Sequence, residues 1–468
     1  MRHEQNIRQS GLPLEMMLLL ALYIALPDYL AVELKAGLPL LTAARVLLVL
    51  AGIGVLLRRR DVFCRDNFCL RNLNLQLTAD KPLQICMGIY FGLLLAINVV
   101  FAMKTTEGVK QIFVLMTEEY ALVWILTMIL TSRERIVSGL KIMTLAAGIL
   151  GLLACLSVIL DYNVFRLLDT GFREELVLRD FHRYGMLRPS CGFQHAVYYG
   201  AFCAVMLPVE MYLVEQEENR KARKMYALCT ALTLAALLLN NSRGSQLAFG
   251  ATAGLIFFIR LARKELGNLF KTYLPIILVA LLIVALVFAC CPVGRYWISQ
   301  QLPGTGTPST STDATSPSDQ VETPELSFGE NPDGLRSRLL QLSGIVYTLD
   351  KSPLLGMGPN AHARGLVGYM YQPGQWWHLK TVDMNIVAII GQYGLLGLLS
   401  FLSLYGGLGI TFLRKQYRGD PLMHQLFLSF VCYMLCLLSI SFLNKWFWVF
   451  VGVVLSLVNV MHKRRSYV

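Results

Sequence analysis

Long, continuous runs of apolar residues alternate with short polar segments along almost the whole chain. In each run the apolar residues follow one another instead of alternating with polar ones, which predicts helices rather than strands. Most runs reach the roughly 18–20 residues that a helix needs to cross a bilayer. We therefore predict an all-α polytopic membrane protein with about 12 transmembrane helices. The predicted spans are 13–34, 38–57, 82–103, 111–131, 138–160, 192–214, 225–241, 244–262, 272–291, 384–412, 421–442 and 446–462.

Composition and charge agree with this class. Of the 468 residues, 55% are hydrophobic and only 15% are charged, and soluble domains are less apolar than this. The net charge of +12 suggests nucleic acid at first sight. The basic clusters, however, fall at alternate ends of the predicted spans, as the positive-inside rule describes. This pattern predicts that both termini are cytoplasmic, and we expect no nucleic-acid partner.

One large polar stretch, 292–383, lies between the ninth and tenth predicted spans and is expected on the outer face. It separates nine spans in residues 1–291 from three in 384–468. Within it, residues 304–331 are rich in Ser, Thr, Pro and Gly, which predicts a disordered linker. The apolar spacing over about 335–350 predicts an amphipathic helix.

Arginines on the outer face are the candidate anion-binding residues, because they oppose the positive-inside trend. A guanidinium group binds phosphate oxygens bidentately and keeps its charge. Arg188, Arg243 and Arg338 stand in three separate outer segments. The alternative is that these side chains pair with acids nearby. That reading is equally weighted for the arginines between 166 and 188, and less favoured for Arg243, which has no close acidic neighbour.

Ionisable residues also fall inside predicted spans. Arg45 lies in the second span, and Glu118 and Glu119 lie in the fourth. An ion pair between Arg45 and one glutamate is favoured over a catalytic carboxylate, and both readings imply a polar cavity that opens outward. No CxxC pair or His/Cys cluster has the spacing of metal ligands, so we expect no metal and no cofactor.

Three sequence patches share their order and predicted side with a known family. They are Arg-Pro-Ser-Cys-Gly-Phe at 188–193, Asn-Ser-Arg-Gly at 241–244, and a series in the large loop and the helix after it. The series consists of Ser337-Arg338, Pro353-Leu-Leu-Gly-Met-Gly358, Val382-Asp383-Met-Asn385 and Gly394-Leu-Leu-Gly397. Together they resemble the O-antigen polymerase and O-antigen ligase superfamily of membrane glycosyltransferases.

This resemblance implies a reaction and a location. Such enzymes act in the bacterial cytoplasmic (inner) membrane and transfer a glycan from undecaprenyl diphosphate to an acceptor hydroxyl at the outer face, without metal or nucleotide sugar. Ligases carry a histidine where this chain has Asp383, which favours a polymerase that joins lipid-linked repeat units. The alternative is a ligase that transfers the glycan to lipid A-core. Implied protein partners are a flippase and a chain-length regulator of the same pathway.

The resemblance and the residues together give a candidate site. Arg188, Arg243 and Arg338 are expected to bind the diphosphate, and Arg338 and Asp383 to act in catalysis. Asp383 is the candidate general base, with an equally weighted alternative that it caps the helix that follows.

Other residues are candidates for contact with the glycan or the acceptor. They are Asn385, His195, His362 and His378. Loop histidines are more often plain surface residues, and Trp376 and Trp377 are more often interfacial anchors than sugar platforms. A twelve-helix transporter, favoured by the ionisable residues within the spans, is the non-enzyme alternative.

Overall fold

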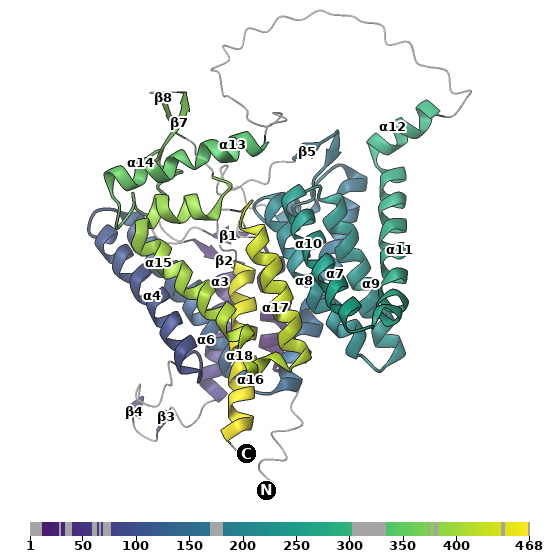
Figure 1. Cartoon of the computed structure of the whole chain (residues 1–468), viewed down its shortest axis with the longest axis horizontal. Helices are drawn as coiled ribbons and strands as arrows, with labels where there is room; N and C mark the ends of the chain where they lie inside the picture. The colour runs from purple at the N-terminus through teal and green to yellow at the C-terminus, as the bar shows by residue number, and fades with distance from the viewer. Residues whose placement is uncertain are drawn as a thin grey trace, which may run out of the picture.

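The computed structural model describes residues 12–27, 30–32, 40–58, 63–64, 67–68, 76–168, 181–301, 334–372, 375–378, 382–440 and 445–466. Helices dominate these residues (Figure 1). The helices are α2 (Leu14–Ala25), α3 (Ala43–Arg58), α4 (Lys81–Ala102), α5 (Thr106–Val114), η2 (Leu115–Ala121, a π-helix), α6 (Leu122–Ile129), α7 (Arg133–Leu160), η3 (Val164–Leu168, a 3-10 helix), α8 (Ala196–Gln216), α9 (Arg220–Leu239), α10 (Arg243–Ala262), α11 (Leu266–Cys290), α12 (Pro292–Gln301), α13 (Gly334–Gln341), α14 (Ser343–Lys351), α15 (Asn385–Leu413), α16 (Lys415–Arg418), α17 (Pro421–Cys436) and α18 (Lys445–Ser466).

Strands form only small antiparallel hairpins in the described part of the chain, with no larger sheet. The pairs are β1 (Ala31–Val32) with β2 (Leu41–Thr42), β3 (Phe63–Cys64) with β4 (Asn67–Phe68), β5 (His182–Arg183) with β6 (Met186–Leu187), and β7 (Gly368–Gln372) with β8 (Gln375–His378).

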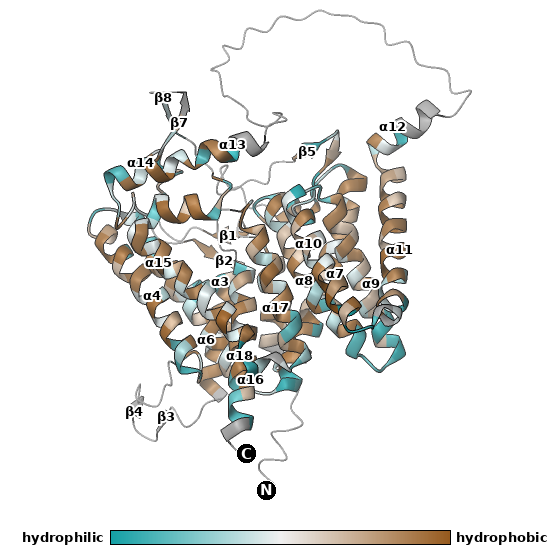
Figure 2. Cartoon of the chain, in the orientation of Figure 1, coloured by the Kyte–Doolittle hydropathy of each residue, from teal (hydrophilic) through white to brown (hydrophobic). Residues whose placement is uncertain are grey.

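The predicted class is confirmed: the protein is an all-α polytopic membrane protein. Among the described residues, nine helices are long and apolar enough to cross a membrane, with α5, η2 and α6 counted as one helix. Three shorter apolar helices lie in α2, α3 and α17. These twelve helices occupy the positions of the twelve predicted spans. Figure 2 shows their apolar bodies with hydrophilic residues gathered at the ends.

Four membrane helices that begin at the end predicted to be cytoplasmic start with a side-chain cap. Asp80, Ser132, Asn219 and Asp420 accept hydrogen bonds from backbone N–H groups in the first turn of α4, α7, α9 and α17. Such caps satisfy the N–H groups that have no partner within the helix. The helix starts are therefore encoded locally, by one polar residue ahead of each apolar run.

The core lies around α8 and α18. About four-fifths of the apolar window of each of these two helices is buried within the protein (83% and 78%), against 22% for α10 and α11. Helix α11 stands at the edge of the bundle (Figure 1), so most of its apolar surface is left for lipid. Helix α8 packs against α9 and α17, and α4 packs against α15.

The large loop begins and ends with helices. Helix α12 takes up its first ten residues, and α13 and α14 cover the segment where one amphipathic helix was expected. The two are separated at Leu342, where Ser343 Oγ donates to the Leu340 carbonyl and accepts from the Met370 N–H of β7. This hydroxyl therefore joins β7 to the break between the helices. The predicted linker 304–331 lies outside the described residues.

Helix α15 is not one straight span. It is broken at Gly394, whose backbone has φ 62° and ψ −155°. The part before the break, Asn385–Tyr393, lies beneath α13 and α14, and the part after it continues into the bundle (Figure 1). The break places the first residues of α15 at the base of the large loop.

Candidate functional site

Three arginines meet at the turn between α9 and α10. Arg183 Nη1 donates to the Asn241 carbonyl at 2.8 Å, and Arg188 Nε donates to the Asn240 carbonyl at 3.2 Å. These carbonyls follow the C-terminus of α9, where the helix dipole favours cations. Arg243 is the first residue of α10, and its guanidinium group donates to the Tyr184 hydroxyl.

The turn itself is held by Asn240. Its side-chain amide donates to the carbonyls of Pro189 (2.7 Å) and Ala196 (2.8 Å) and so joins two of the predicted motif patches, 188–193 and 241–244. Asn241 supplies the positive φ, 54°, that closes the turn, a conformation that asparagine tolerates better than most residues. The motif residues around Arg188 and Arg243 thus build one structure.

The cluster is electrostatically unbalanced in the described part of the chain, where none of its three arginines forms an ion pair with Asp or Glu. Asp161 pairs with His182 instead, at 3.0 Å. Burial, with Arg183 nearby, lowers the pKa of Arg188 to about 10. Burial and the charge of Arg188 lower the pKa of His195 to about 4, so this histidine is neutral near pH 7. The cluster is therefore suited to an anion of more than one charge.

His195 has a structural role in this place. Its Nδ1 accepts from the Val197 N–H at 3.1 Å and so caps α8, and its ring lies 4.4 Å from that of Phe181. The imidazole is half-buried beside the arginine cluster. It lies at the predicted site and also orders the start of α8.

The second group of predicted residues lies at the start of α15. Arg338 Nε stands 3.9 Å from Asp383 Oδ2, and the two side chains are 37% and 53% exposed. At this distance the pair is not hydrogen-bonded, and Arg338 Nε is a buried donor without an acceptor. Such a donor is costly unless something else supplies the acceptor. The arrangement leaves a buried N–H group of Arg338 without an acceptor, in a side chain that is otherwise partly exposed.

The capping alternative for Asp383 is wrong. The residue that caps α15 is Met384, and no side chain accepts a bond there. The backbone N–H of Asp383 donates to Gln341 Oε1 at 2.9 Å, which holds the carboxylate beside α13. Because the Asp383 side chain is about half exposed, the partial desolvation expected of a buried base is not present in this structure.

Both groups of residues border the C-terminal end of α17. The Asn385 N–H donates to the Leu437 carbonyl at 3.3 Å. Two residues further on, Ser439 lies against the turn that carries Arg243, since a Cβ on Gly244 would come within 2.2 Å of its hydroxyl. The starts of α10 and α15, about 140 residues apart in the chain, are thus placed on either side of one short segment.

The remaining predicted residues differ in exposure. Asn385 is buried, and its Oδ1 lies 3.5 Å from the Tyr405 hydroxyl. His362 is also buried, with Nδ1 2.6 Å from the Tyr369 hydroxyl, so its reading as a surface residue is wrong. His378 is exposed on β8, and its Nδ1 lies 3.2 Å from the Val367 carbonyl. Of these three, only His378 presents its ring to solvent.

The predicted intramembrane pair is confirmed. Arg45 Nε donates to Glu118 Oε1 at 2.6 Å, with the two side chains 17% and 25% exposed. Glu119 accepts from the Tyr90 hydroxyl at 3.0 Å. Both glutamates lie in the π-helix η2, and both have structural partners.

Sequence reasoning did not single out Arg183 or Tyr184. Arg183 was one of five arginines in a single outer segment, and nothing in their spacing distinguished it. The β5–β6 hairpin selects it, because the turn at Tyr184 and Gly185 directs both residues toward α10. The Arg-Tyr-Gly turn was the local signal, since glycine at a positive φ favours a tight hairpin.

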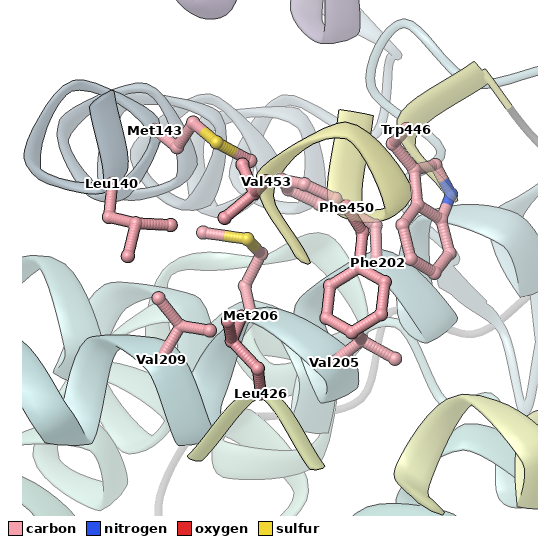
Figure 3. A pocket seen from close by; sticks show the side chains of 10 residues that line it. All are labelled: Leu140, Met143, Phe202, Val205, Met206, Val209, Leu426, Trp446, Phe450 and Val453. Carbon is pink, nitrogen blue, oxygen red and sulfur yellow. The ribbon is translucent and has the colours of Figure 1, made fainter. Parts of the chain in front are cut away.

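The cavity between α7, α8, α17 and α18 is not part of this site. It is about 20 Å³ in volume and lies inside the bundle, lined by apolar side chains (Figure 3). A cavity of this size holds about one water molecule and offers no polar partners for it. Among the described residues, no three His, Cys, Asp or Glu side chains are grouped so that they could hold a metal ion.

Comparison with known proteins gives one match. Residues 228–402 match the family model described as "O-Antigen ligase". The matched region runs from α9 to α15 and contains Arg243, Arg338 and Asp383, whereas Arg183 and Arg188 precede it. No curated protein matches the chain.

Proposed function

We propose that the chain polymerises lipid-linked glycan repeat units, because residues 228–402 match the family model described as "O-Antigen ligase". This match supports membrane glycan transfer of the O-antigen polymerase and ligase type in general. In our proposal the donor is an oligosaccharide on undecaprenyl diphosphate. The reaction takes place at the outer face of the bacterial cytoplasmic membrane, and both termini of the chain are cytoplasmic.

The observation that carries the proposal is the group of three guanidinium groups at the α9–α10 turn. They form no ion pair with a carboxylate among the described residues, and they lie at the end of a membrane helix. A diphosphate has several oxygens and more than one negative charge, which matches several fork-shaped donors. The undecaprenyl chain of such a donor would extend into the bilayer beside the same helix.

The chemistry follows from where negative charge develops. As the bond between the anomeric carbon and the leaving oxygen breaks, charge grows on the diphosphate, and fixed guanidinium groups stabilise it more than they stabilise the ground state. We propose that Arg188 and Arg243 hold the diphosphate, together with Arg183. Arg338 supplies its partly exposed side chain from the other side of the α17 segment. These cations do the work that a metal ion does in many nucleotide-sugar enzymes.

The acceptor hydroxyl forms the new bond to the anomeric carbon as the old one breaks. Asp383 is the proposed base that takes the hydroxyl proton, and undecaprenyl diphosphate leaves with the bonding electron pair. Attack opposite the leaving group predicts inversion at the anomeric carbon in a single-step displacement. The 3.9 Å gap between Arg338 and Asp383 keeps the carboxylate beside a cation without a direct hydrogen bond to it.

The test is reconstitution of the purified protein with the undecaprenyl-diphosphate repeat unit of its host, with products separated on a gel. We expect a ladder of lengthening lipid-linked glycan for the wild type and a loss of about 100-fold or more in rate for Arg338→Ala. Arg223→Ala, an exposed arginine at the opposite end of α9, is the control and should keep the wild-type rate.

The other outcomes separate the alternatives. Transfer that occurs only after a lipid A-core acceptor is added would replace the polymerase with a ligase. Unchanged donor under both conditions, from folded wild-type protein, would overturn glycan transfer and favour the transporter. A ladder of unchanged intensity in Arg338→Ala would keep the polymerase and overturn the role of Arg338.

A further inference from the structure

Two motifs that the proposed chemistry leaves unused lie directly against each other. The turn Pro353–Gly358 follows α14, and Gly394 is the break in α15. Four backbone hydrogen bonds join them. The N–H groups of Met357 and Gly358 donate to the carbonyls of Gly391 and Gln392, both at 2.9 Å. In return, the N–H groups of Leu395 and Leu396 donate to the carbonyls of Pro353 and Leu354, at 2.8 and 3.1 Å.

The contact satisfies the groups that the break exposes. A broken helix leaves carbonyls on one side and N–H groups on the other without their helical partners, and in a membrane protein these must be paired. Here one turn pairs both sets. The turn and the break therefore form a single unit held by main-chain atoms.

The close approach requires glycine on both sides. A Cβ on Gly356 would lie 2.5 Å from the Gly394 nitrogen, and a Cβ on Gly394 would lie 2.6 Å from the Gly356 nitrogen. Both residues also have positive φ, 68° and 62°, which other residues rarely adopt. Any side chain at either position would push the two segments apart.

The same unit fixes the far end of the half-helix that starts beside Asp383. The start of this half-helix, Asn385–Tyr393, is held by Gln341 of α13 and by the Leu437 carbonyl. Its end is held by the Pro353–Gly358 turn. Helices α13 and α14 connect these two attachments, and α14 packs along α15. The two helices, the turn and the half-helix therefore form a closed ring of contacts. Arg338 of α13 and Asp383, just before the half-helix, lie where α13 meets the start of α15.

A polar contact on the outside strengthens the turn. Asn360 donates its backbone N–H to Gln392 Oε1 at 3.4 Å and its side-chain amide to Glu107 Oε2 at 2.8 Å. Glu107 lies at the start of α5. The turn is thus tied both to the break in α15 and to the neighbouring membrane helix.

We propose that the Pro353–Gly358 turn is a positioning latch for the reaction. Its main-chain pairing with the break at Gly394 sets the separation of Arg338 and Asp383, and Gly356 and Gly394 are the positioning residues. The inference rests on the proposed function, because it assigns the latch to those two side chains. It predicts a defect mainly in the chemical step and a much smaller one in binding of the donor diphosphate, because three of the four proposed diphosphate ligands, Arg183, Arg188 and Arg243, lie on other elements.

The experiment compares Gly356→Ala and Gly394→Ala with Gly406→Ala. Gly406 lies in the same helix α15, and a Cβ there would meet nothing within 4 Å. Hydrogen exchange should show loss of protection at the amides of Met357, Gly358, Leu395 and Leu396 in the first two variants only. With the lipid-diphosphate donor, kcat should fall about 100-fold, while KM stays within about threefold of wild type because the arginine cluster is untouched.

Loss of amide protection with unchanged kcat would overturn the latch, and so would a rise in KM as large as the fall in kcat. Where the alanine variants do not fold, Asn360→Gly removes the exposed tie to Glu107 while preserving the positive φ of 54° at that position. For this variant, too, the latch predicts a fall in kcat with little change in KM. A folded wild type that transfers no glycan would overturn the proposed function itself, whereas an active wild type with fully active latch variants would overturn only the latch.

Discussion

At the scale of single residues, each arginine of the outer cluster is held by one bond and leaves other donors available. Arg183 and Arg188 each use one N–H group on a carbonyl at the end of α9, and Arg243 uses one on the Tyr184 hydroxyl. A guanidinium group has five N–H donors. Each of these hydrogen bonds therefore orients its guanidinium group and leaves most of the N–H donors of that group available.

Loss of one of these guanidinium groups should lower kcat/KM for the lipid-diphosphate donor without unfolding the protein. We expect Arg188→Ala to lower kcat/KM for the lipid-diphosphate donor by about 10- to 100-fold, the effect of one charge-assisted hydrogen bond. Arg188→Lys should recover only part of this, because an ammonium group cannot bind bidentately. Steady-state kinetics on purified variants, with Arg223→Ala as control, is the measurement. If Arg188→Ala and Arg188→Lys were as active as Arg223→Ala, Arg188 would not be part of the site.

His362 gives a pH-dependent prediction. Burial lowers the pKa of its imidazole from 6.5 to about 4, so the folded loop holds it neutral while the unfolded chain protonates it below about pH 6.5. The free energy of unfolding is therefore full above pH 6.5 and falls as the pH drops toward 4, by about 2 kcal/mol at pH 5. Thermal melting at pH 7.5 and pH 5 should show a fall in Tm for the wild type.

The control for this effect is the other histidine of the same loop. His362→Gln should lose about half of the difference in Tm between the two pH values, because glutamine does not titrate, whereas His195, whose pKa is lowered as far, keeps its contribution. His378→Gln should keep the full difference, since His378 is exposed. A wild-type pH dependence that survives in full in His362→Gln would assign it to other groups.

Only part of the site was predictable at this scale. Arg243 stood out in the sequence because no acid lies near it, and Arg338 because of its motif. Arg183 and Tyr184 could not be chosen, since their partners are about 60 residues away in the chain and only the β5–β6 hairpin brings them to the turn. The burial of His362 was equally hidden, because the loop sequence around it is rich in glycine and predicts no regular element.

At the scale of elements, the twelve membrane helices followed from hydropathy alone, but their interruptions did not. Continuous apolar composition predicts a helix because lipid offers no other partner for the backbone. The same composition continues through the break at Gly394 and the π-helix η2. An isolated glycine is compatible with a helix, so the break is decided by the distant Pro353–Gly358 turn that fills it.

The Arg45–Glu118 pair joins α3 to η2 and yields a double-mutant prediction. Removing one partner leaves a charge in a poorly hydrated place, whereas replacing both with apolar side chains removes the problem. We expect Arg45→Met and Glu118→Met each to lower stability by about 2–3 kcal/mol, near the low end for buried pairs because both side chains retain some exposure. The double variant should be more stable than either single one by about 1 kcal/mol or more. Thermal melting in detergent measures this, and strictly additive effects would contradict an energetic coupling of the two residues.

At the scale of the whole molecule, the proposed function depends on which ends of the helices face outward. The arginine cluster, α13, α14 and the β7–β8 hairpin lie at one end of the bundle, and the C-terminal end of α18 lies at the other (Figure 1). That second end carries Lys463 and Arg464, and also the capped starts of α4, α7, α9 and α17. Lysine and arginine concentrate on the cytoplasmic side of bacterial membrane proteins. In the proposed orientation the arginine cluster is therefore the exception to the rule, and its cost in orientation calls for a functional use.

This orientation can be tested with two reporters. Green fluorescent protein fused after Val468 should fluoresce in cells, and alkaline phosphatase fused at the same place should be inactive, because the first folds in the cytoplasm and the second outside it. Alkaline phosphatase inserted within residues 304–331 should be active. The reverse pattern would put the arginine cluster in the cytoplasm, where nucleotide sugars are available as donors. It would thereby contradict transfer from a lipid diphosphate at the outer face, even if the cluster still bound a diphosphate.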